Sequence, residues 1–234
     1  GRHTESNNDE TGNADAENAV IKCKDGSQVV LCGAGTLNVQ ANGKNGVKSG
    51  ATTEDGEASL TIRDLTLTID APVNDAVNAE AALEIESGAL TLSAGDDALH
   101  CDYTLNIGAE GTDGPSVTIT SCYEGLEGAA VNVFSGSISI RSTDDCINAA
   151  NADLTGYSYE LNIFGGTITA HGTAGQVVVA SGTATDGMLL PLPEGVTDEQ
   201  VTTGSVQLHV QVTPNLERPA TLPTGNWALG PVLC

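Results

Sequence analysis

Short runs in which apolar and polar residues alternate recur along the chain, and each is followed by a polar turn. Five of these segments read LTLTIDAPVNDAVNAE, ALTLSAGDDALHCD, SVTITSCYEGLEGA, SISIRSTDDCINAA and TITAHGTAGQVVVA, and they cover residues 65–80, 89–102, 116–129, 137–150 and 167–180. TLNVQANGKNGVKS at 36–49 belongs to the same series. Matching apolar residues recur every 21 to 30 positions; they are Val39, Ile69, Leu92, Ile119, Ile140 and Ile168. The pattern predicts a repeated unit of short strands joined by turns.

A repeat of this length is typical of a solenoid, in which each coil stacks on the next and buries a common core. An antiparallel β-sandwich also uses short strands, but it gives no reason for acidic residues to return at the same phase. We therefore predict an all-β, right-handed parallel β-helix of about six coils. It should occupy residues 21–182, after a flexible acidic leader at 1–20 and before a C-terminal cap or assembly strand within 183–234.

The composition narrows the possible partners. The chain has 8 Lys or Arg against 31 Asp or Glu, and its formal charge is -23. Nucleic acids and anionic membrane surfaces attract basic proteins, so neither is an expected partner. Membrane insertion is not expected either, because no apolar stretch approaches the roughly 20 residues of a spanning helix.

The chain has six cysteines, at positions 23, 32, 101, 122, 146 and 234. Their spacing does not fit a zinc site, whereas an even number fits disulfide bonds in an exported protein. The alternative is that Cys101, Cys122 and Cys146 are small buried core residues.

Acidic residues return at one position of successive turns. Two residues before the apolar residues Val47, Val77, Leu99, Leu126 and Ile147 stand Asn45, Asp75, Asp97, Glu124 and Asp145. In a parallel β-helix these positions lie about 4.8 Å apart, so the carboxylates would repel one another unless a cation lay between them. Calcium suits such oxygen ligands. The alternative is that Asp and Asn are simply good turn residues, which fits Asn45 and Asn74 best.

We therefore predict a calcium site among eight residues: Asp75, Asp96, Asp97, Glu124, Glu127, Asp144, Asp145 and Asn148.

The turn motifs resemble a known family. GDDALHCD, YEGLEGA and DDCINAA, at 95–102, 123–129 and 144–150, resemble the signature of bacterial secreted carbohydrate-binding β-helix proteins. That family is similar in fold to calcium-dependent pectate lyases, has no established lyase activity, and is described as binding calcium, cellulose and acidic plant-wall polysaccharide. The resemblance covers about 30–180 and implies a calcium role for Asp96, Asp97, Glu124, Asp144 and Asp145. Two departures are Cys146, where the family usually has Gly, and HGTAGQVVVA at 171–180, which lacks a further Asp-rich turn.

The predicted function is therefore polysaccharide binding, as in an adhesin, at a bacterial cell surface or outside the cell. Residues that could contact the sugar are Tyr123, Arg141, His100 and His171. We expect no enzymatic activity, although a polysaccharide lyase is a minor alternative that would need Arg141 as its base. The main alternative is a structural subunit of a surface fibre or homo-oligomer that assembles through the alternating strand VQLHVQV at 206–212. Regular outward Thr columns leave ice binding as a remote third possibility.

Overall fold

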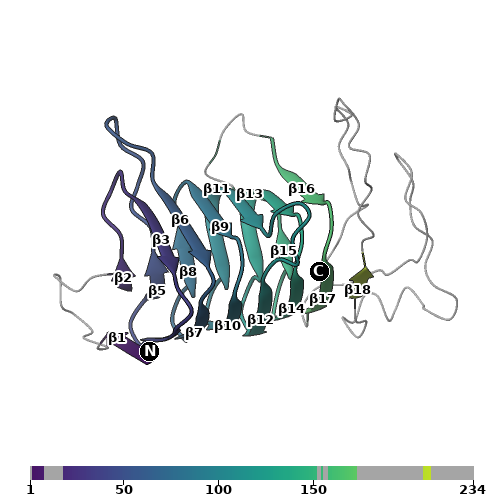
Figure 1. Ribbon diagram of the computed structural model, residues 1–234, viewed down its shortest axis with the longest axis horizontal. Coiled ribbons are helices and arrows are strands. Elements are labelled where there is room, and N and C mark those ends of the chain that lie inside the picture. Colours follow the sequence, from purple (N-terminus) through teal and green to yellow (C-terminus); the bar gives the residue numbers. More distant parts are fainter. Residues whose placement is uncertain (1, 8–17, 152–153, 155–157, 173–207, 212–234) are drawn as a thin grey trace, which may run out of the picture.

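The computed structural model describes residues 2–7, 18–151, 154, 158–172 and 208–211, which form a β-solenoid of about six turns with no helix (Figure 1). No helix in these residues is therefore long and apolar enough to cross a membrane. The predicted all-β parallel solenoid is confirmed.

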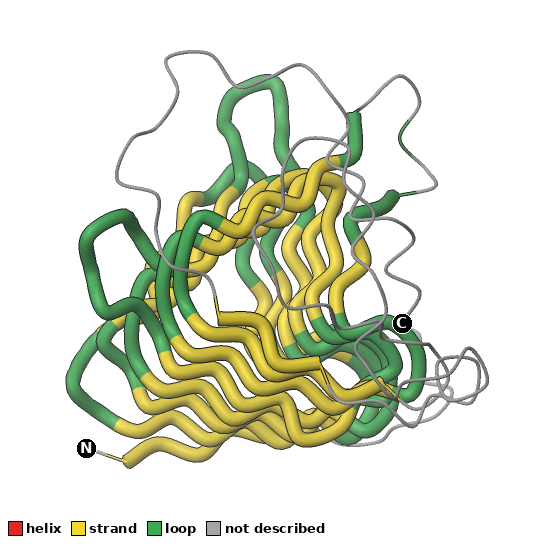
Figure 2. The backbone as a smooth tube through the Cα atoms, turned by 90° about the vertical axis from the view of Figure 1, so that its right-hand side faces the viewer, coloured by secondary structure: helices red, strands yellow, loops and turns green. Residues whose placement is uncertain are grey.

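Two long sheets make up the walls of the solenoid (Figure 2). The first sheet contains β1 (Arg2–Asn7), β4 (Thr36–Ala41), β7 (Thr66–Ala71), β10 (Ala89–Ala94), β12 (Ser116–Ser121), β14 (Ser137–Ser142), β17 (Thr167–Gly172) and β18 (Leu208–Gln211). The second contains β2 (Ala19–Lys22), β3 (Gln28–Cys32), β5 (Asn45–Lys48), β6 (Ser59–Arg63), β8 (Val77–Ala79), β9 (Ala82–Ile85), β11 (Leu99–Ile107), β13 (Leu126–Val133), β15 (Ile147–Asn148) and β16 (Glu160–Ile163).

The strands stack in the register that the sequence pattern predicts, except at the last step. In the first sheet the matched apolar residues pair in one continuous column, from Val39 through Ile69, Leu92 and Ile119 to Ile140. The predicted match of Ile140 with Ile168 is wrong by two residues, because Ile140 pairs with Ala170 and Ile168 pairs with Ile138. Because side chains alternate along a strand, both columns point inward, and all six matched residues are at most 3% exposed. The burial of these aliphatic columns is the main stabilising contribution to the fold.

The prediction of a flexible leader at 1–20 is wrong for residues 2–7 and 19–20, which belong to strands. β1 pairs in parallel with β4, and β2 starts at Ala19 and pairs with β5, so both strands extend the sheets at the N-terminal end. Pairing uses backbone N–H and C=O groups, which an outermost strand supplies whatever its side chains are. The remaining leader residues, 1 and 8–17, lie outside the described residues.

The predicted C-terminal strand lies at the other end. Within 206–212, residues 208–211 form β18, which pairs antiparallel with β17 of the same chain. The rest of 183–234 lies outside the described residues, and so does the stretch 173–182 of the predicted solenoid.

The expected disulfides are not present among the described cysteines: no disulfide bond joins any of Cys23, Cys32, Cys101, Cys122 and Cys146. The alternative is confirmed for Cys101, Cys122 and Cys146, which are at most 2% exposed in the core. Burial raises the pKa of Cys101 to about 11 and that of Cys122 to about 12, so both thiols stay protonated. Cys234 lies outside the described residues.

Candidate functional site

The turns between the two sheets bring the acidic residues into one column. The apolar residues that follow each turn pair in the predicted order, Val47, Val77, Leu99, Leu126 and Ile147. Backbone hydrogen bonds of 2.9 Å tie each turn to the next; they run from Ala76 N to Asp97 O, from Ala98 N to Glu124 O and from Gly125 N to Asp145 O. We call Asp75, Asp97, Glu124 and Asp145, which stack in this way, the acidic ladder.

The first side chains of this column have a structural role. Asn45 Oδ1 accepts hydrogen bonds from the backbone N–H of Asp75 at 3.2 Å and from Asn74 Nδ2 at 2.6 Å. Asp75 Oδ1 repeats the contact one coil further on, because it accepts the N–H of Asp97 at 3.1 Å. Side-chain oxygens thus satisfy turn donors of the neighbouring coil, and for Asn45 and Asn74 this fits the turn interpretation.

Three carboxylates converge at the centre of the ladder. One oxygen of each of Asp75, Asp96 and Asp97 lies within 4.8 Å of the other two. Asp75 and Asp97 are 4% and 7% exposed, whereas Asp96 faces solvent. Burial raises the pKa of all three, and the negative charge of Asp97 adds to the rise at Asp75 and Asp96. We call these residues the three-carboxylate group; it is the arrangement of oxygens that a hard cation would neutralise.

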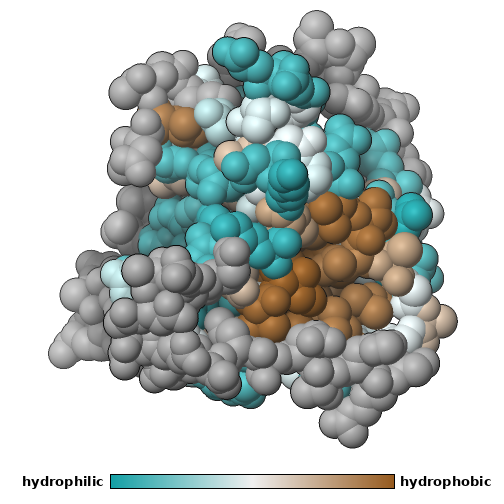
Figure 3. Space-filling model, turned by 90° about the vertical axis from the view of Figure 1, so that its left-hand side faces the viewer, coloured by the Kyte–Doolittle hydropathy of each residue, from teal (hydrophilic) through white to brown (hydrophobic). Residues whose placement is uncertain are grey.

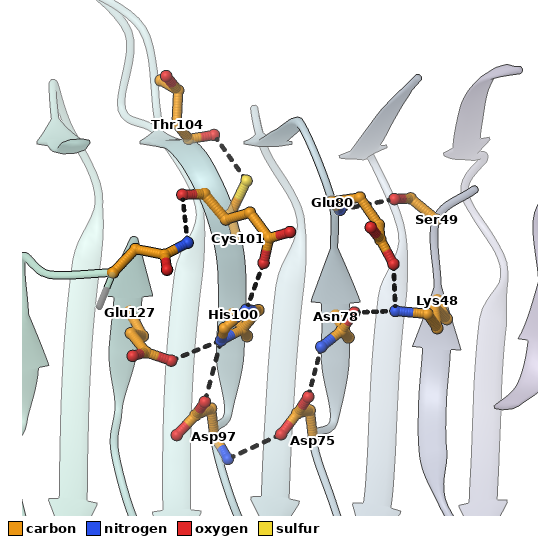
Figure 4. A network of polar contacts seen from close by, with 12 residues as sticks. Lys48, Ser49, Asp75, Asn78, Glu80, Asp97, His100, Cys101, Thr104 and Glu127 are labelled. Carbon is orange, nitrogen blue, oxygen red and sulfur yellow. Dashed lines mark hydrogen bonds and ion pairs between the residues drawn. The ribbon is translucent and has the colours of Figure 1, made fainter. Parts of the chain in front are cut away.

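His100 lies at the centre of a second cluster (Figure 4). Its Nδ1 is 3.1 Å from Asp97 Oδ2 and 2.5 Å from Glu127 Oε2, and its Nε2 is 2.9 Å from Asp102 Oδ1. Burial alone would lower the pKa of His100, but the hydrogen bonds to Asp102, Asp97 and Glu127 outweigh it and raise that pKa to about 12. His100 is therefore an imidazolium at neutral pH and serves as an internal cation for these acids.

This cluster contains two of the residues that the sequence singled out. Glu127, predicted as a calcium ligand, lies against His100 and forms with Asp97 and His100 a second group whose ligand atoms lie within 4.8 Å of one another, beside the three-carboxylate group. His100, predicted to contact sugar, uses both ring nitrogens on carboxylates of its own chain. The physical reason is the register, because Glu127 pairs with His100 in the adjacent strand while Asp97 stands three residues before it.

The carboxylates around Glu124 and Asp145, in the second half of the ladder, lie further apart. Glu124 accepts a hydrogen bond from Asn148 Nδ2 at 2.9 Å, and Asp144 accepts one from the Tyr123 hydroxyl, which raises the pKa of Tyr123. Burial raises the pKa of Glu124 and of Asp145, with further contributions from neighbouring acids. Glu124, Asp144 and Asp145 do not converge within 4.8 Å in the way that the three-carboxylate group does.

Exposed side chains flank the ladder. Tyr123 directly precedes Glu124 and is 47% exposed. On the first sheet, Arg141 is exposed and lies opposite His171 in the register of β14 and β17. Phe134 and Phe164 stack with ring centroids 5.0 Å apart and lie half-buried at a corner.

The raised pKa values predict an unusual pH dependence. Burial, partly offset by His100, raises the pKa of Asp97 to about 6, above the roughly 3.9 of an unfolded Asp. The folded state then binds more protons between these values, so the free energy of unfolding falls as pH rises through this window. Calcium-free protein should therefore resist urea better at pH 5 than at pH 7. Lower resistance to urea at pH 5 than at pH 7 would contradict the raised pKa of Asp97 in the folded state. Calcium should stabilise the protein more at pH 7 than at pH 5.

Comparison with known proteins gives one match. A family model described as a carbohydrate-binding domain-containing protein matches residues 3–106, which include most of β1, all of β2 to β10, the three-carboxylate group and His100. No curated protein and no solved structure matches the chain. The β-solenoid and this match together fit a carbohydrate-binding β-helix and suggest that the chain binds polysaccharide.

Proposed function

We propose that the protein binds calcium at the three-carboxylate group and, through it, an acidic polysaccharide at the bacterial cell surface or outside the cell. The observation that carries this proposal is the convergence of three carboxylates within 4.8 Å, two of them buried, all with raised pKa. A cation relieves their repulsion, whereas His100 already neutralises the neighbouring acids.

The ligand atoms favour calcium over other metals. The group offers only carboxylate oxygens, which suit a hard cation, whereas zinc prefers nitrogen and sulfur. The one nitrogen ligand nearby belongs to His100, whose ring is occupied by three carboxylates. Asp75, Asp96 and Asp97 would hold the ion, with Glu124 next along the ladder as a further ligand.

The net charge of the protein indicates how it could bind an acidic polysaccharide. A protein of formal charge -23 repels a polyuronate unless a cation lies between them. Calcium bound at the ladder would neutralise the carboxylates and leave coordination positions for a sugar carboxylate. The exposed face of Tyr123 lies beside the ladder and suits stacking against a sugar ring, and the exposed Arg141 adds a cation for a second carboxylate.

The exposed member of the group provides the cleanest test. Asp96→Asn removes one charged ligand without disturbing a buried hydrogen bond, so the fold should persist while calcium affinity falls by tenfold or more, about 1.4 kcal/mol. Isothermal titration with calcium measures this directly. The matched control is Asp113→Asn, the same change on an exposed loop outside the ladder, which should bind calcium like the parent.

The same pair of variants tests the sugar step. In calcium, polygalacturonate should bind the parent and Asp113→Asn and should bind Asp96→Asn weakly; in chelator it should bind none of them. Equal calcium affinity in all three proteins would contradict the metal assignment. Calcium binding without polygalacturonate binding would leave the ion structural and favour the alternative of a surface assembly. We infer binding without cleavage, and release of unsaturated sugar during the same incubation would instead show a lyase.

A further inference from the structure

The two buried carboxylates of the three-carboxylate group are each held by a side chain from outside the group. Asp97 Oδ2 lies 3.1 Å from His100 Nδ1, and Asp75 Oδ2 accepts a hydrogen bond of 2.6 Å from Asn78 Nδ2. Each partner stands three residues after its carboxylate, and Asn78 pairs with His100 across β8 and β11. Asn78 therefore holds, one coil earlier, the place beside Asp75 that His100 holds beside Asp97 (Figure 4).

The carboxylate of Asp75 is fixed at both of its oxygens. Oδ2 accepts the amide N–H of Asn78, and Oδ1 accepts the backbone N–H of Asp97 at 3.1 Å. A carboxylate oxygen has two lone pairs, so these bonds leave one on each oxygen for a cation. Since Asp75 is only 4% exposed, these two protein donors, and not bulk water, set the direction of its carboxylate.

Lys48 determines which end of the Asn78 amide faces Asp75. An amide can present its oxygen or its nitrogen to a neighbour, and the choice follows from the chemistry of its partners. Lys48 Nζ lies 2.5 Å from Asn78 Oδ1 and can only donate, so the amide oxygen faces Lys48 and the amide nitrogen faces Asp75. Without Lys48 the amide could turn and set its oxygen against the carboxylate, where two acceptors repel.

Lys48 is itself held in place. Its Nζ lies 2.8 Å from Glu80 Oε1, and the backbone N–H of Glu80 donates to Ser49 Oγ at 2.9 Å. Among the described residues of this column, only Lys22 lies between Lys48 and the N-terminal end of the solenoid, where Figure 3 shows polar surface beside an apolar patch. The ammonium group reaches away from that end, to Asn78 and Glu80 of the next coil. Because Glu80 neutralises it, Lys48 acts on the site by orienting Asn78 and repels a cation little.

We propose that Lys48 and Asn78 are positioning residues that set the calcium affinity of the three-carboxylate group. This inference rests on the calcium binding proposed above. Lys48 orients Asn78, and Asn78 holds Asp75 in the direction in which it faces the other two carboxylates. An ion then meets a ligand that is already ordered, so less conformational entropy is lost on binding. Side chains that hold metal ligands in this way typically contribute tenfold or more to affinity.

The first test removes the hydrogen bond to Asp75. Asn78→Ala should weaken calcium binding by about tenfold in isothermal titration. The matched control is Asn106→Ala, because Asn106 Nδ2 donates to Glu84 Oε1 at 2.7 Å and its Oδ1 accepts from Asn132 Nδ2 at 2.8 Å, outside the acidic ladder. Both variants should lose similar resistance to urea in chelator, but the control should bind calcium like the parent. Equal calcium affinity in the two variants would overturn the proposal.

The second test removes the orienting group and keeps the net charge. Lys48→Met combined with Glu80→Gln deletes both members of the ion pair and should weaken calcium binding between about threefold and tenfold, because Asn78 is no longer oriented. Lys48→Arg, with Glu80 unchanged, keeps a group that can only donate and should retain the parental affinity. Parental affinity in the double variant, or the same loss in Lys48→Arg, would overturn the role of Lys48.

A measurement without calcium separates this proposal from the proposed function. The side-chain NH₂ signals of Asn78, identified by their loss in Asn78→Ala, report the surroundings of the amide in the NMR spectrum of calcium-free protein. They should keep their positions in Lys48→Arg and shift in the double variant. Unchanged signals in the double variant would overturn the proposal, whether or not calcium binds. Absence of calcium binding in the parent would overturn the proposed function and this proposal together, whereas equal binding in parent and variants would overturn this proposal alone.

Discussion

Replacing His100 with Gln is expected to lower the free energy of unfolding by about 3–5 kcal/mol in calcium-free buffer at neutral pH. The imidazolium contacts Asp97, Asp102 and Glu127 at 2.5–3.1 Å, and its side chain is 21% exposed. Gln can donate hydrogen bonds but carries no charge, so three acids would be left around an uncharged side chain. Removing one partner of a buried ion cluster costs this much because the other charges remain.

A matched variant separates charge from packing. His100→Lys keeps the positive charge and has a precedent in the same column, where Lys48 lies 2.8 Å from Glu80 and donates to Asn78. It should retain most of the stability that His100→Gln loses. Urea unfolding of the two variants measures the difference. Equal loss in both would show that shape, and not charge, is what His100 contributes.

Replacing Leu99 with Ala is expected to lower the free energy of unfolding by about 2–5 kcal/mol. Leu99 is 0% exposed, lies between Val77 and Leu126 in the core column, and directly follows the turn that holds Asp96 and Asp97. The cavity would remove contacts from three coils at once. Because a folded domain has only about 5–15 kcal/mol in total, calcium-free protein should approach the limit of stability.

Thermal unfolding checks this prediction. For a chain of this size each kcal/mol corresponds to about 2–4 °C, so Leu99→Ala should melt at least several degrees below the parent. Val73→Ala is the control, since that side chain is 55% exposed and its loss should change the melting temperature little. A similar small change in both variants would contradict the assignment of Leu99 to the core.

The register of the coils could be predicted because two independent patterns agree. Alternation fixes which residues face inward, and the polar turns fix the phase, so pairs such as Leu99 with Leu126 and Ile119 with Ile140 follow from the sequence. The stacking of Asp75 on Asp97 follows from the same argument. The predicted columns are therefore confirmed except at β17, where Ile140 pairs with Ala170 and not with Ile168. Alternation alone could not detect this difference, because a shift of two residues keeps the same side chains facing inward.

Other features depend on contacts that no pattern displays. β1 pairs with β4 through its backbone, so its polar sequence gave no apolar alternation from which a strand could be predicted. The role of His100 depends on three acids from two coils that converge on its ring. The sequence pattern places Glu127 beside His100 in the next coil, but it does not predict the contacts with all three acids. The cysteine count predicted disulfides, but stacking at the core positions of separate coils buries Cys101, Cys122 and Cys146 individually.

The measurement that tests the central proposal most directly is a set of thermal melts in chelator and in calcium, each with and without polygalacturonate. Calcium should raise the melting temperature by several degrees, because it binds the folded three-carboxylate group and not the unfolded chain. Polygalacturonate should raise it further in calcium and leave it unchanged in chelator. No change of melting temperature in calcium would contradict the proposal. The acidic residues of the ladder would then serve only to form turns, and His100 alone would neutralise their charge.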